Sequence, residues 1–298
     1  MEYVYSQSSK GFPVLWLQQA LVAAGCVCYP DSVFGEKTFE AIKSIQKQNG
    51  LEETGCAGIK EFELLGLKFP DEFSRILNLC SCFENTSFHK ATGPSVSGWN
   101  NAGIHWGIIN FTNVTGELQR FIISLMEQIP EMEECAETIM GHDKIKEFMT
   151  RLHSIDNKAL DQKYISSDGN LDYKVAILFA RWGAIPAVQL AQIERARNIY
   201  WTKTVIACER LFANPPNVRS KGFIYDTILQ NGLMSNLVWE AESKRMKPEM
   251  DVCNFILDKT LERYNLCCHS DIISRKTVFL RGKGKVNSWC YNLDCYAL

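Results

Sequence analysis

The sequence predicts a mainly α-helical protein in which a small three-helix domain precedes a larger α-rich domain with one short β-piece. Apolar residues recur at helical spacing through most of the 298 residues. Alternation typical of strands is weak and confined to one short segment. Hydrophobic residues make up 46% of the chain, which allows a substantial core. A chain of this length is expected to form one large or two modest domains.

The composition excludes several kinds of protein. The net charge is -2, from 32 basic and 34 acidic residues, so there is no electrostatic basis for binding nucleic acid. The longest basic cluster, "RGKGK" at Arg281–Lys285, is expected to be a solvated turn. The 12 cysteines include no C-x-x-C pair and histidines number only 5, so no zinc site and no other cofactor are expected. We expect buried, reduced thiols, or disulfides if the protein works in an oxidising compartment.

The N-terminal sequence carries no recognisable targeting signal. It opens with an acidic residue and has no basic region before its apolar stretch, so no signal peptide is expected. No apolar run reaches the roughly 18 residues that a membrane span needs. We therefore expect a protein made in the cytoplasm, whose action outside the cell would need a separate delivery route.

The first predicted helix begins near residue 13. "PVLWLQQALVAAG" places Val14, Leu17, Leu21 and Val22 on one helical face, and Gly25 is a typical stop. A second helix follows, in which Phe39, Ile42 and Ile45 repeat at helical spacing before Asn49-Gly50. A third, "IKEFELLGL", closes a unit of about 55 residues, which is small for an independent core.

This unit resembles the peptidoglycan-binding repeat domain found on many cell-wall hydrolases. Ser32 replaces the glycine that usually follows the aspartate of the motif, where a tight turn is expected. The resemblance implies a wall-binding domain over residues 1–68, with peptidoglycan as its ligand. The matching residues are Val14, Leu17, Gln18, Leu21, Gly25, Asp31, Phe34, Gly35, Thr38, Ala41, Ile42, Ile45, Gln46, Gly50 and Leu51.

The second domain is predicted over residues 69–298 and is mainly helical to the end. The segment Lys68–Arg75 is expected to hold the linker and the start of the next helix. The long apolar segment that begins near residue 173 should break or kink near Ala184, ahead of Pro186. "AGIHWGIINF" is the one candidate β-piece, with Ile104, Trp106 and Ile108 alternating between two glycines.

A single carboxylate, Glu84, follows a predicted helix and opens a polar loop. Partial burial against Phe83 and Phe88 would raise the pKa of this carboxyl group toward the range that a general acid needs. Glycoside hydrolysis would also need a second carboxylate across a cleft, or a positioned water. From the residues alone, a glutamate at a helix end is more typical of a solvated surface position.

Four motifs, in order, resemble the lysozyme-like chitosanases of glycoside hydrolase family forty-six and related peptidoglycan hydrolases. They are "FEN" at Phe83–Asn85, "NNAGIHWGIINF" followed by "TGEL" at Asn100–Leu118, "VRSKGFIYDTILQNG" at Val218–Gly232, and "DIISRKTVFLRGKGKVNSW" at Asp271–Trp289. The resemblance covers most of residues 74–298 and implies a lysozyme-like fold with Glu84 as proton donor.

The family's second catalytic group, an aspartate, falls on Asn100, and an amide cannot act as a general base at ordinary pH. Three outcomes stay open. Asn100 or Asn101 orients a water or binds an N-acetyl group while the chemistry depends on Glu84. Another carboxylate, Glu117 or Asp226, substitutes for the aspartate. Or the domain is inactive and only binds glycan.

Other residues near the motifs are candidates for substrate binding or for structural roles. Asp226 is equally expected to be a buried anchor, paired with Arg195 or Arg197. Trp99 and Trp106 could stack on sugars, although aromatic residues more often lie in a core. The candidate substrate-binding residues are Asn100, Asn101, His105, Thr112 and Gln230, and Asn113 is expected to line the sugar cleft beside Thr112.

Together these resemblances imply a two-domain muramidase-type hydrolase of β-1,4 bonds in peptidoglycan. Two settings fit the missing signal peptide: a phage endolysin released through a holin, and an exported antibacterial effector with an immunity protein. Either would act on the wall from the periplasm or at a host envelope. The alternatives are a chitosanase, a non-catalytic glycan-binding protein, and a cysteine peptidase, which would need a Cys–His pair.

Overall fold

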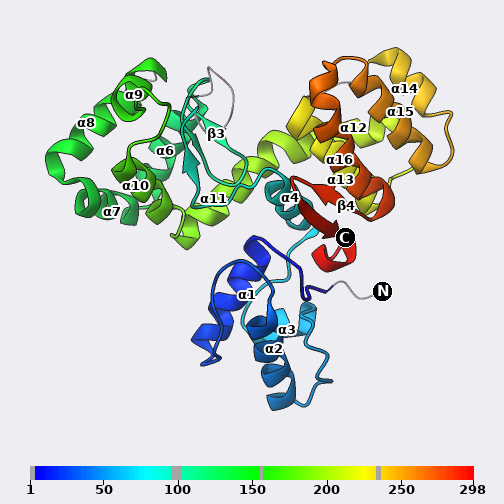
Figure 1. Ribbon diagram of the computed structural model, residues 1–298, viewed down its shortest axis with the longest axis horizontal. Coiled ribbons are helices and arrows are strands. Elements are labelled where there is room, and N and C mark those ends of the chain that lie inside the picture. Colours follow the sequence, from blue (N-terminus) through cyan, green and yellow to red (C-terminus); the bar gives the residue numbers. More distant parts are fainter. Residues whose placement is uncertain (1–3, 95–102, 155–156, 233–235) are drawn as a thin grey trace. The chain divides into compact units, whose positions relative to one another are not determined.

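The computed structural model describes residues 4–94, 103–154, 157–232 and 236–298. The chain forms two compact units, whose helices and strands are drawn in Figure 1. The first comprises Met1–Phe83 together with Arg197–Leu298, and the second is Glu84–Ala196. The predicted fold class is confirmed, because the described elements are mainly helices with a few short strands.

The first unit begins with three helices, α1 (Phe12–Ala23), α2 (Glu36–Gln48) and α3 (Ile59–Leu64), which we call the N-terminal module. The predicted apolar stripe of α1 is confirmed at three of its four positions, because Val14, Leu17 and Leu21 are fully buried. Val22 was wrongly placed on that stripe: it is 44% exposed. It lies about 100° around the helix from Leu21, which turns it away from the core of the module.

The rest of the first unit consists of helices and one terminal hairpin. The helices are α4 (Glu72–Phe83), α12 (Thr202–Leu211), α13 (Val218–Asn231), α14 (Leu237–Ser243), α15 (Glu249–Leu261) and α16 (Leu266–Arg281), with a π-helical turn at Arg197–Trp201. Strands β4 (Lys283–Val286) and β5 (Trp289–Asn292) pair antiparallel, and a 3-10 turn follows at Leu293–Tyr296. The chain is therefore mainly helical after residue 69, as expected, but it ends in a hairpin that was not predicted.

The basic cluster at Arg281–Lys285 does not form the expected solvated turn. Arg281 ends α16, Gly282 takes a positive φ of 72°, and Lys283 begins β4. Glycine suits that position because it has no Cβ to resist the left-handed conformation. The cluster therefore joins a helix to a strand, and Lys283 and Lys285 are both exposed on one face of that strand.

Within its described residues, the second unit places a three-stranded sheet beside six helices. The strands β1 (Ala91–Thr92), β2 (His105–Trp106) and β3 (Phe111–Thr112) pair antiparallel in that order. The predicted β-piece is thus confirmed, but it turns at Gly107, whose φ is +85°, into a hairpin instead of one strand. The helices are α6 (Glu117–Gln128), α7 (Glu131–Met140), α8 (His142–His153), α9 (Asn157–Tyr164), α10 (Tyr173–Trp182) and α11 (Pro186–Ala196).

The predicted break before Pro186 is confirmed. Helix α10 ends at Trp182 and α11 begins at Pro186, where a missing N–H group costs nothing. In the described part of the chain, no single helix has the length and apolar character to cross a membrane. Within the described residues, Tyr173–Trp182 and Pro186–Leu211 reach that length and apolar character only when taken together, and the two are bent by 87° relative to each other.

Candidate functional site

Glu84 is the first residue after α4, and its side chain is half-buried. The residue before it, Phe83, is 1% exposed and makes edge contacts with Phe279 and Tyr291 at centroid distances of 5.9 and 4.9 Å. The Asn287 amide also donates to the Phe83 carbonyl at 3.2 Å. These contacts fix the end of α4. The backbone position from which the Glu84 side chain projects is therefore fixed as well.

The loop after Glu84 is tied to the β2–β3 hairpin. The Thr86 hydroxyl donates to the Ile108 carbonyl at 2.7 Å. Gln192, which is fully buried on α11, accepts from the Ile108 N–H at 2.9 Å and donates to the Phe88 carbonyl at 3.2 Å. One buried amide thus fixes the loop and the hairpin together, as buried polar groups require.

Two of the predicted substrate-binding residues lie opposite each other in this hairpin. His105 on β2 pairs with Thr112 on β3. Both ring nitrogens of His105 are shielded from solvent and make no hydrogen bond within the part of the chain that the structure describes. Beside the pair, the buried Asn113 accepts from the Ile104 N–H and donates to Asp161, both at 2.7 Å.

Gln192 was not expected to have any role, whereas Asn113 was expected to line the sugar cleft with Thr112 and not to position the hairpin. Asn113 had one sequence signal, because it follows the β-piece directly within the "FTNVTGEL" segment. Gln192 had none, because its partners lie 84 and 104 residues away along the chain. An amide on a helix has no local pattern that would indicate such distant contacts.

Glu117 lies in the first turn of α6, where a carboxylate is stabilised by the helix dipole. Its Oε1 is 3.5 Å from Nε of Arg195, and its side chain is 27% exposed. Arg195 had been expected to pair with Asp226, which was wrong, because it pairs with Glu117 instead. Glu117 therefore keeps some access to solvent but is already engaged by a cation.

Asp226 on α13 is fully buried between two cations of α16, Arg275 and Lys276. Arg197, the other expected partner, instead pairs with Asp71 at 2.7 Å. Burial by itself raises the pKa of Asp226, but Arg275 and Lys276 outweigh it and lower that pKa to about 2. Of the two roles left open by the sequence, this environment favours the structural anchor, because a general base must reach a water.

Gln230, one turn further along α13, joins the same contacts between the two helices. Its amide donates to Asp271 at 2.6 Å and accepts from the Lys276 ammonium at 3.2 Å. Both ends of the side chain are thus used within the helix pair. Its predicted role in substrate binding stays a prediction.

Of the remaining candidates, which are two tryptophans and two asparagines, only Trp106 lies within the residues that the structure describes. Trp106 is fully buried, stacks on Phe179 at 5.2 Å and donates from its indole to the Phe179 carbonyl at 3.1 Å. It is therefore a core residue. Trp99, Asn100 and Asn101 lie outside the described residues.

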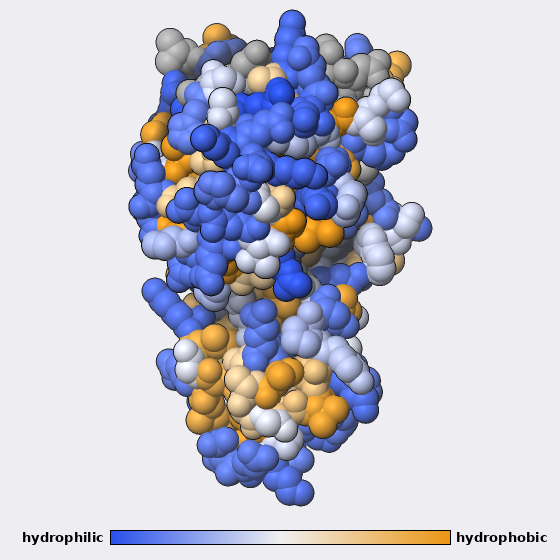
Figure 2. Space-filling view, turned by 90° about the vertical axis from the view of Figure 1, so that its left-hand side faces the viewer, coloured by the Kyte–Doolittle hydropathy of each residue, from blue (hydrophilic) through white to orange (hydrophobic). Residues whose placement is uncertain are grey.

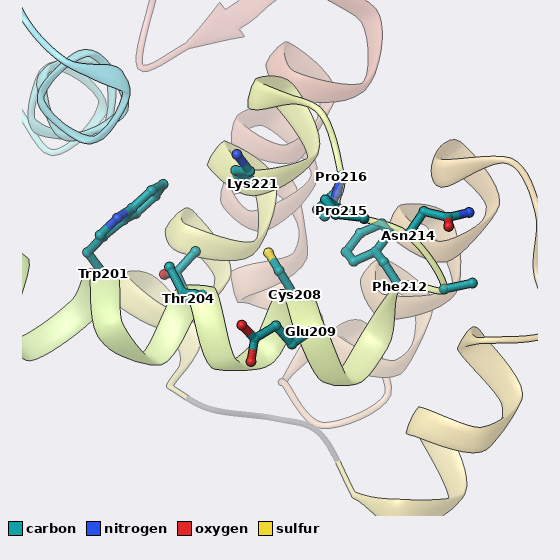
Figure 3. Close-up of a pocket in the computed structure, with 11 residues that line it drawn as sticks. Trp201, Thr204, Cys208, Glu209, Phe212, Asn214, Pro215, Pro216 and Lys221 are labelled. Atoms are coloured by element: carbon teal, nitrogen blue, oxygen red, sulfur yellow. The ribbon is translucent and has the colours of Figure 1, made fainter.

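A cavity of about 390 Å³ lies in the first unit between α12, the Phe212–Pro216 segment and Lys221 (Figure 3). Figure 3 shows Trp201 at one end, Phe212 at the other and the Cys208 sulfur between them. Burial raises the pKa of Cys208 to about 12, so this thiol is a poor nucleophile. None of the predicted site residues lines this cavity.

The described residues contain no group of three His, Cys, Asp or Glu side chains able to hold a metal ion. All 12 cysteines are free thiols, but only four are buried, and Cys267 and Cys290 are exposed. The expectation of buried thiols is therefore wrong for much of the set.

Residues 10–65 match the sequence model of the family described as peptidoglycan binding domain. This match lies within the predicted wall-binding domain. It identifies the N-terminal module as a peptidoglycan-binding module, which is the name we use below. No curated protein matches the chain.

Solved structures of chitosanases are similar to most of the chain. A Gynuella sunshinyii chitosanase of glycoside hydrolase family 46, in complex with chitotetraose, is 13% identical with a TM-score of 0.50. The match covers 75% of this chain and 98% of that one. A native chitosanase from Bacillus subtilis MY002 is 15% identical, with a TM-score of 0.48 and coverage of 74% and 98%. The similarity to the Gynuella structure shows a shared, chitosanase-like helical fold.

Proposed function

We propose that this protein hydrolyses β-1,4 glycosidic bonds in the glycan of bacterial peptidoglycan. The observation that carries the proposal is the combination, on one chain, of a peptidoglycan-binding module and a chitosanase-like fold. The module supports peptidoglycan as the ligand. The similar Gynuella protein was solved with a sugar chain, chitotetraose, which supports a glycan as the substrate.

Glu84 is the residue that we propose as the general acid. It is half-buried, and it follows a helix end that Phe83 and Asn287 hold in place. A positioned carboxylic acid can protonate the oxygen of the leaving sugar while an oxocarbenium-like centre develops. We further propose that Glu84 is the one essential carboxylate, since Asp226 is enclosed by cations and Glu117 is engaged by Arg195.

The test compares Glu84→Gln with Glu117→Gln in the whole protein, using purified sacculi. Glu84→Gln removes the transferable proton and should lower sugar release by at least about a hundredfold, the scale of general acid catalysis. Glu117→Gln is the matched control and should lower it less than about tenfold. Near-normal release by Glu84→Gln would remove Glu84 from the mechanism. Equal losses would instead make Glu117 the second carboxylate.

Two other functions are separated by the products. A chitosanase would release sugars from chitosan and not from sacculi. Its substrate carries positive charges, which favour an acidic cleft, whereas the described stretch around Glu84 contains no second acid before Glu117. A non-catalytic binder would sediment with sacculi and release nothing. Mass spectrometry of the released fragments, with new reducing ends as the expected result, distinguishes all three.

The proposed site of action is the cell wall, reached from the periplasm or at a host envelope. An endolysin that depends on a holin and an exported effector with an immunity protein are the two proposed settings. Co-expression separates them, because an effector's neighbouring immunity protein would bind and inhibit the enzyme, whereas a holin would not.

A further inference from the structure

The peptidoglycan-binding module exposes a contiguous apolar segment at the end of α1. Val22, Ala23, Ala24 and Gly25 are all exposed, and Val27 beyond them is 75% exposed. Figure 2 shows hydrophobic side chains gathered on the surface of the module that carries α1. Single exposed apolar residues are ordinary, but a contiguous group indicates an interaction site.

Burial alternates along the segment that follows α1. Cys26 is half-buried and Cys28 is 8% exposed, whereas Val27 and Tyr29 are 75% and 65% exposed. Such alternation is typical of an extended backbone, in which every second side chain points the same way. Val27 and Tyr29 therefore present an aliphatic group and an aromatic ring on one outward side.

A groove of about 330 Å³ runs between residues 24–27 and α2. Ala24 and Val27 belong to its apolar wall. The opposite wall is a polar stripe of α2, formed by Lys37, Glu40, Ser44 and Gln48. These residues recur at helical spacing, so they lie along one face and span about 16 Å.

The two walls together suit an oligosaccharide. Pyranose rings have flat faces that pack on apolar and aromatic surfaces, and hydroxyl and amide groups at their edges that need both donors and acceptors. The polar stripe supplies an ammonium, a carboxylate, a hydroxyl and an amide, with charges that cancel. A stripe of this length fits several sugar units, and its neutrality fits a glycan backbone better than a charged polymer.

We propose that the groove between α2 and residues 24–27 is the peptidoglycan-binding surface of the module and takes the glycan strand. This inference rests on the proposed function for the identity of the ligand. The family match covers all the residues that form the groove, which favours peptidoglycan over a lipid surface or a second protein. A lipid surface would also be expected to meet cationic residues, whereas the groove has one lysine and one glutamate.

The experiment changes each wall in the whole protein and measures co-sedimentation with purified sacculi. Val27→Ser combined with Tyr29→Ser removes one residue of the apolar wall and the exposed ring two positions beyond it, and Ser44→Trp fills the groove from the other side. The matched control is Ile59→Ser combined with Leu64→Ser on α3, where the side chains are 46% and 47% exposed but do not line the groove. All these positions are exposed or lie at the surface, so circular dichroism and melting should match the wild type.

Each groove variant should bind sacculi at least tenfold more weakly, and the α3 variant should bind like the wild type. Unchanged binding by both groove variants would overturn the proposal, as would an equal loss in the α3 variant. Binding to anionic phospholipid vesicles that falls in the groove variants, while sacculus binding is kept, would also overturn it.

Cleavage of soluble peptidoglycan fragments is measured alongside. Cleavage at the wild-type rate by the groove variants supports a binding role, whereas a wild type that binds but cleaves nothing contradicts only the proposed hydrolysis.

Discussion

Two buried glutamines hold the loops of the peptidoglycan-binding module. Gln18 donates to Asp31 at 2.9 Å and to Thr38 at 3.0 Å, and accepts from the Ser32 N–H at 2.9 Å. Gln46 makes the corresponding contacts in the second loop, including a donation to Glu61 at 2.9 Å. Every hydrogen-bonding atom of these amides is thus used inside the module, which explains why glutamine recurs after an apolar residue in both helices.

Ser32, which occupies the motif's usual glycine position, has a positive φ of 65°. The expected turn is therefore present, with serine in a conformation that disfavours a Cβ. We predict that Ser32→Gly raises the free energy of unfolding by about 0.5–1 kcal/mol, since relief of strain exceeds the added freedom of the unfolded chain. Urea denaturation of the whole protein measures the difference.

The control for this prediction is Ser44→Gly, the same substitution in the middle of α2. There the glycine should lower the free energy of unfolding by about 0.5 kcal/mol, because it weakens a helix. A change of the same sign in both variants would contradict the role assigned to the positive φ of Ser32.

At the residue scale, the sequence predicted what depends on local spacing. The buried stripe of α1 and the position of Glu84 after a helix follow from neighbours within a few residues. The contacts that fix the surroundings of Glu84 do not. Gln192 and Asn287 act on Phe88 and Phe83 across 104 and 204 residues, and no local pattern encodes such pairs.

At the scale of elements, the β4–β5 hairpin was not predicted, because its turn lacks the residues that usually indicate one. Its turn residues, Asn287 and Ser288, both have positive φ, at 46° and 72°. This is the geometry of a type I′ turn, for which Asn-Gly is the strong sequence signal. Here the second turn residue is serine, and the strand sequence "KGKV" resembles a basic loop. The hairpin was therefore not predicted from the sequence.

The pairing of α13 with α16 depends on Asp226. We predict that Asp226→Asn lowers the free energy of unfolding at pH 7 by about 3–5 kcal/mol, because Arg275 and Lys276 are left buried without their counter-charge. The control is Glu262→Gln on the surface, where loss of the solvent-screened pair with Lys259 should change stability little. Equal effects of the two substitutions would contradict the anchor role.

The same ion pair predicts a pH dependence. The pKa of Asp226 is lowered from 3.8 to about 2 in the folded protein. A carboxyl with a depressed folded pKa stabilises the fold fully above its unfolded pKa, and this contribution is lost as the pH falls from about 4 to about 2. Asp226→Asn should therefore lose less stability than the wild type over that interval, measured by denaturation at each pH.

At the scale of the whole molecule, the chain's C-terminal residues complete the core of the peptidoglycan-binding module. Ala297, which is 1% exposed, belongs to the same buried cluster as Tyr5, Leu17 and Phe62. The Ser9 hydroxyl also donates to the Cys295 carbonyl. Residues 1–68 were predicted as a domain from a contiguous motif, and a motif of that kind cannot indicate a contribution from about 230 residues away.

Removal of Ala297 and Leu298 should therefore loosen the peptidoglycan-binding module, although both residues lie outside the predicted domain. Both residues are buried and Ala297 lies within the module's core, so hydrogen exchange of the amides in α1 and α2 should become at least about tenfold faster. Mass spectrometry of the exchanged peptides measures this in the whole protein. Trp289→Ser serves as the control, because it removes an exposed ring that contacts Lys10 at 3.2 Å but no buried side chain. If exchange in α1 and α2 stays at the wild-type rate after the deletion, the module is an independent unit and the C-terminal residues only cover its surface.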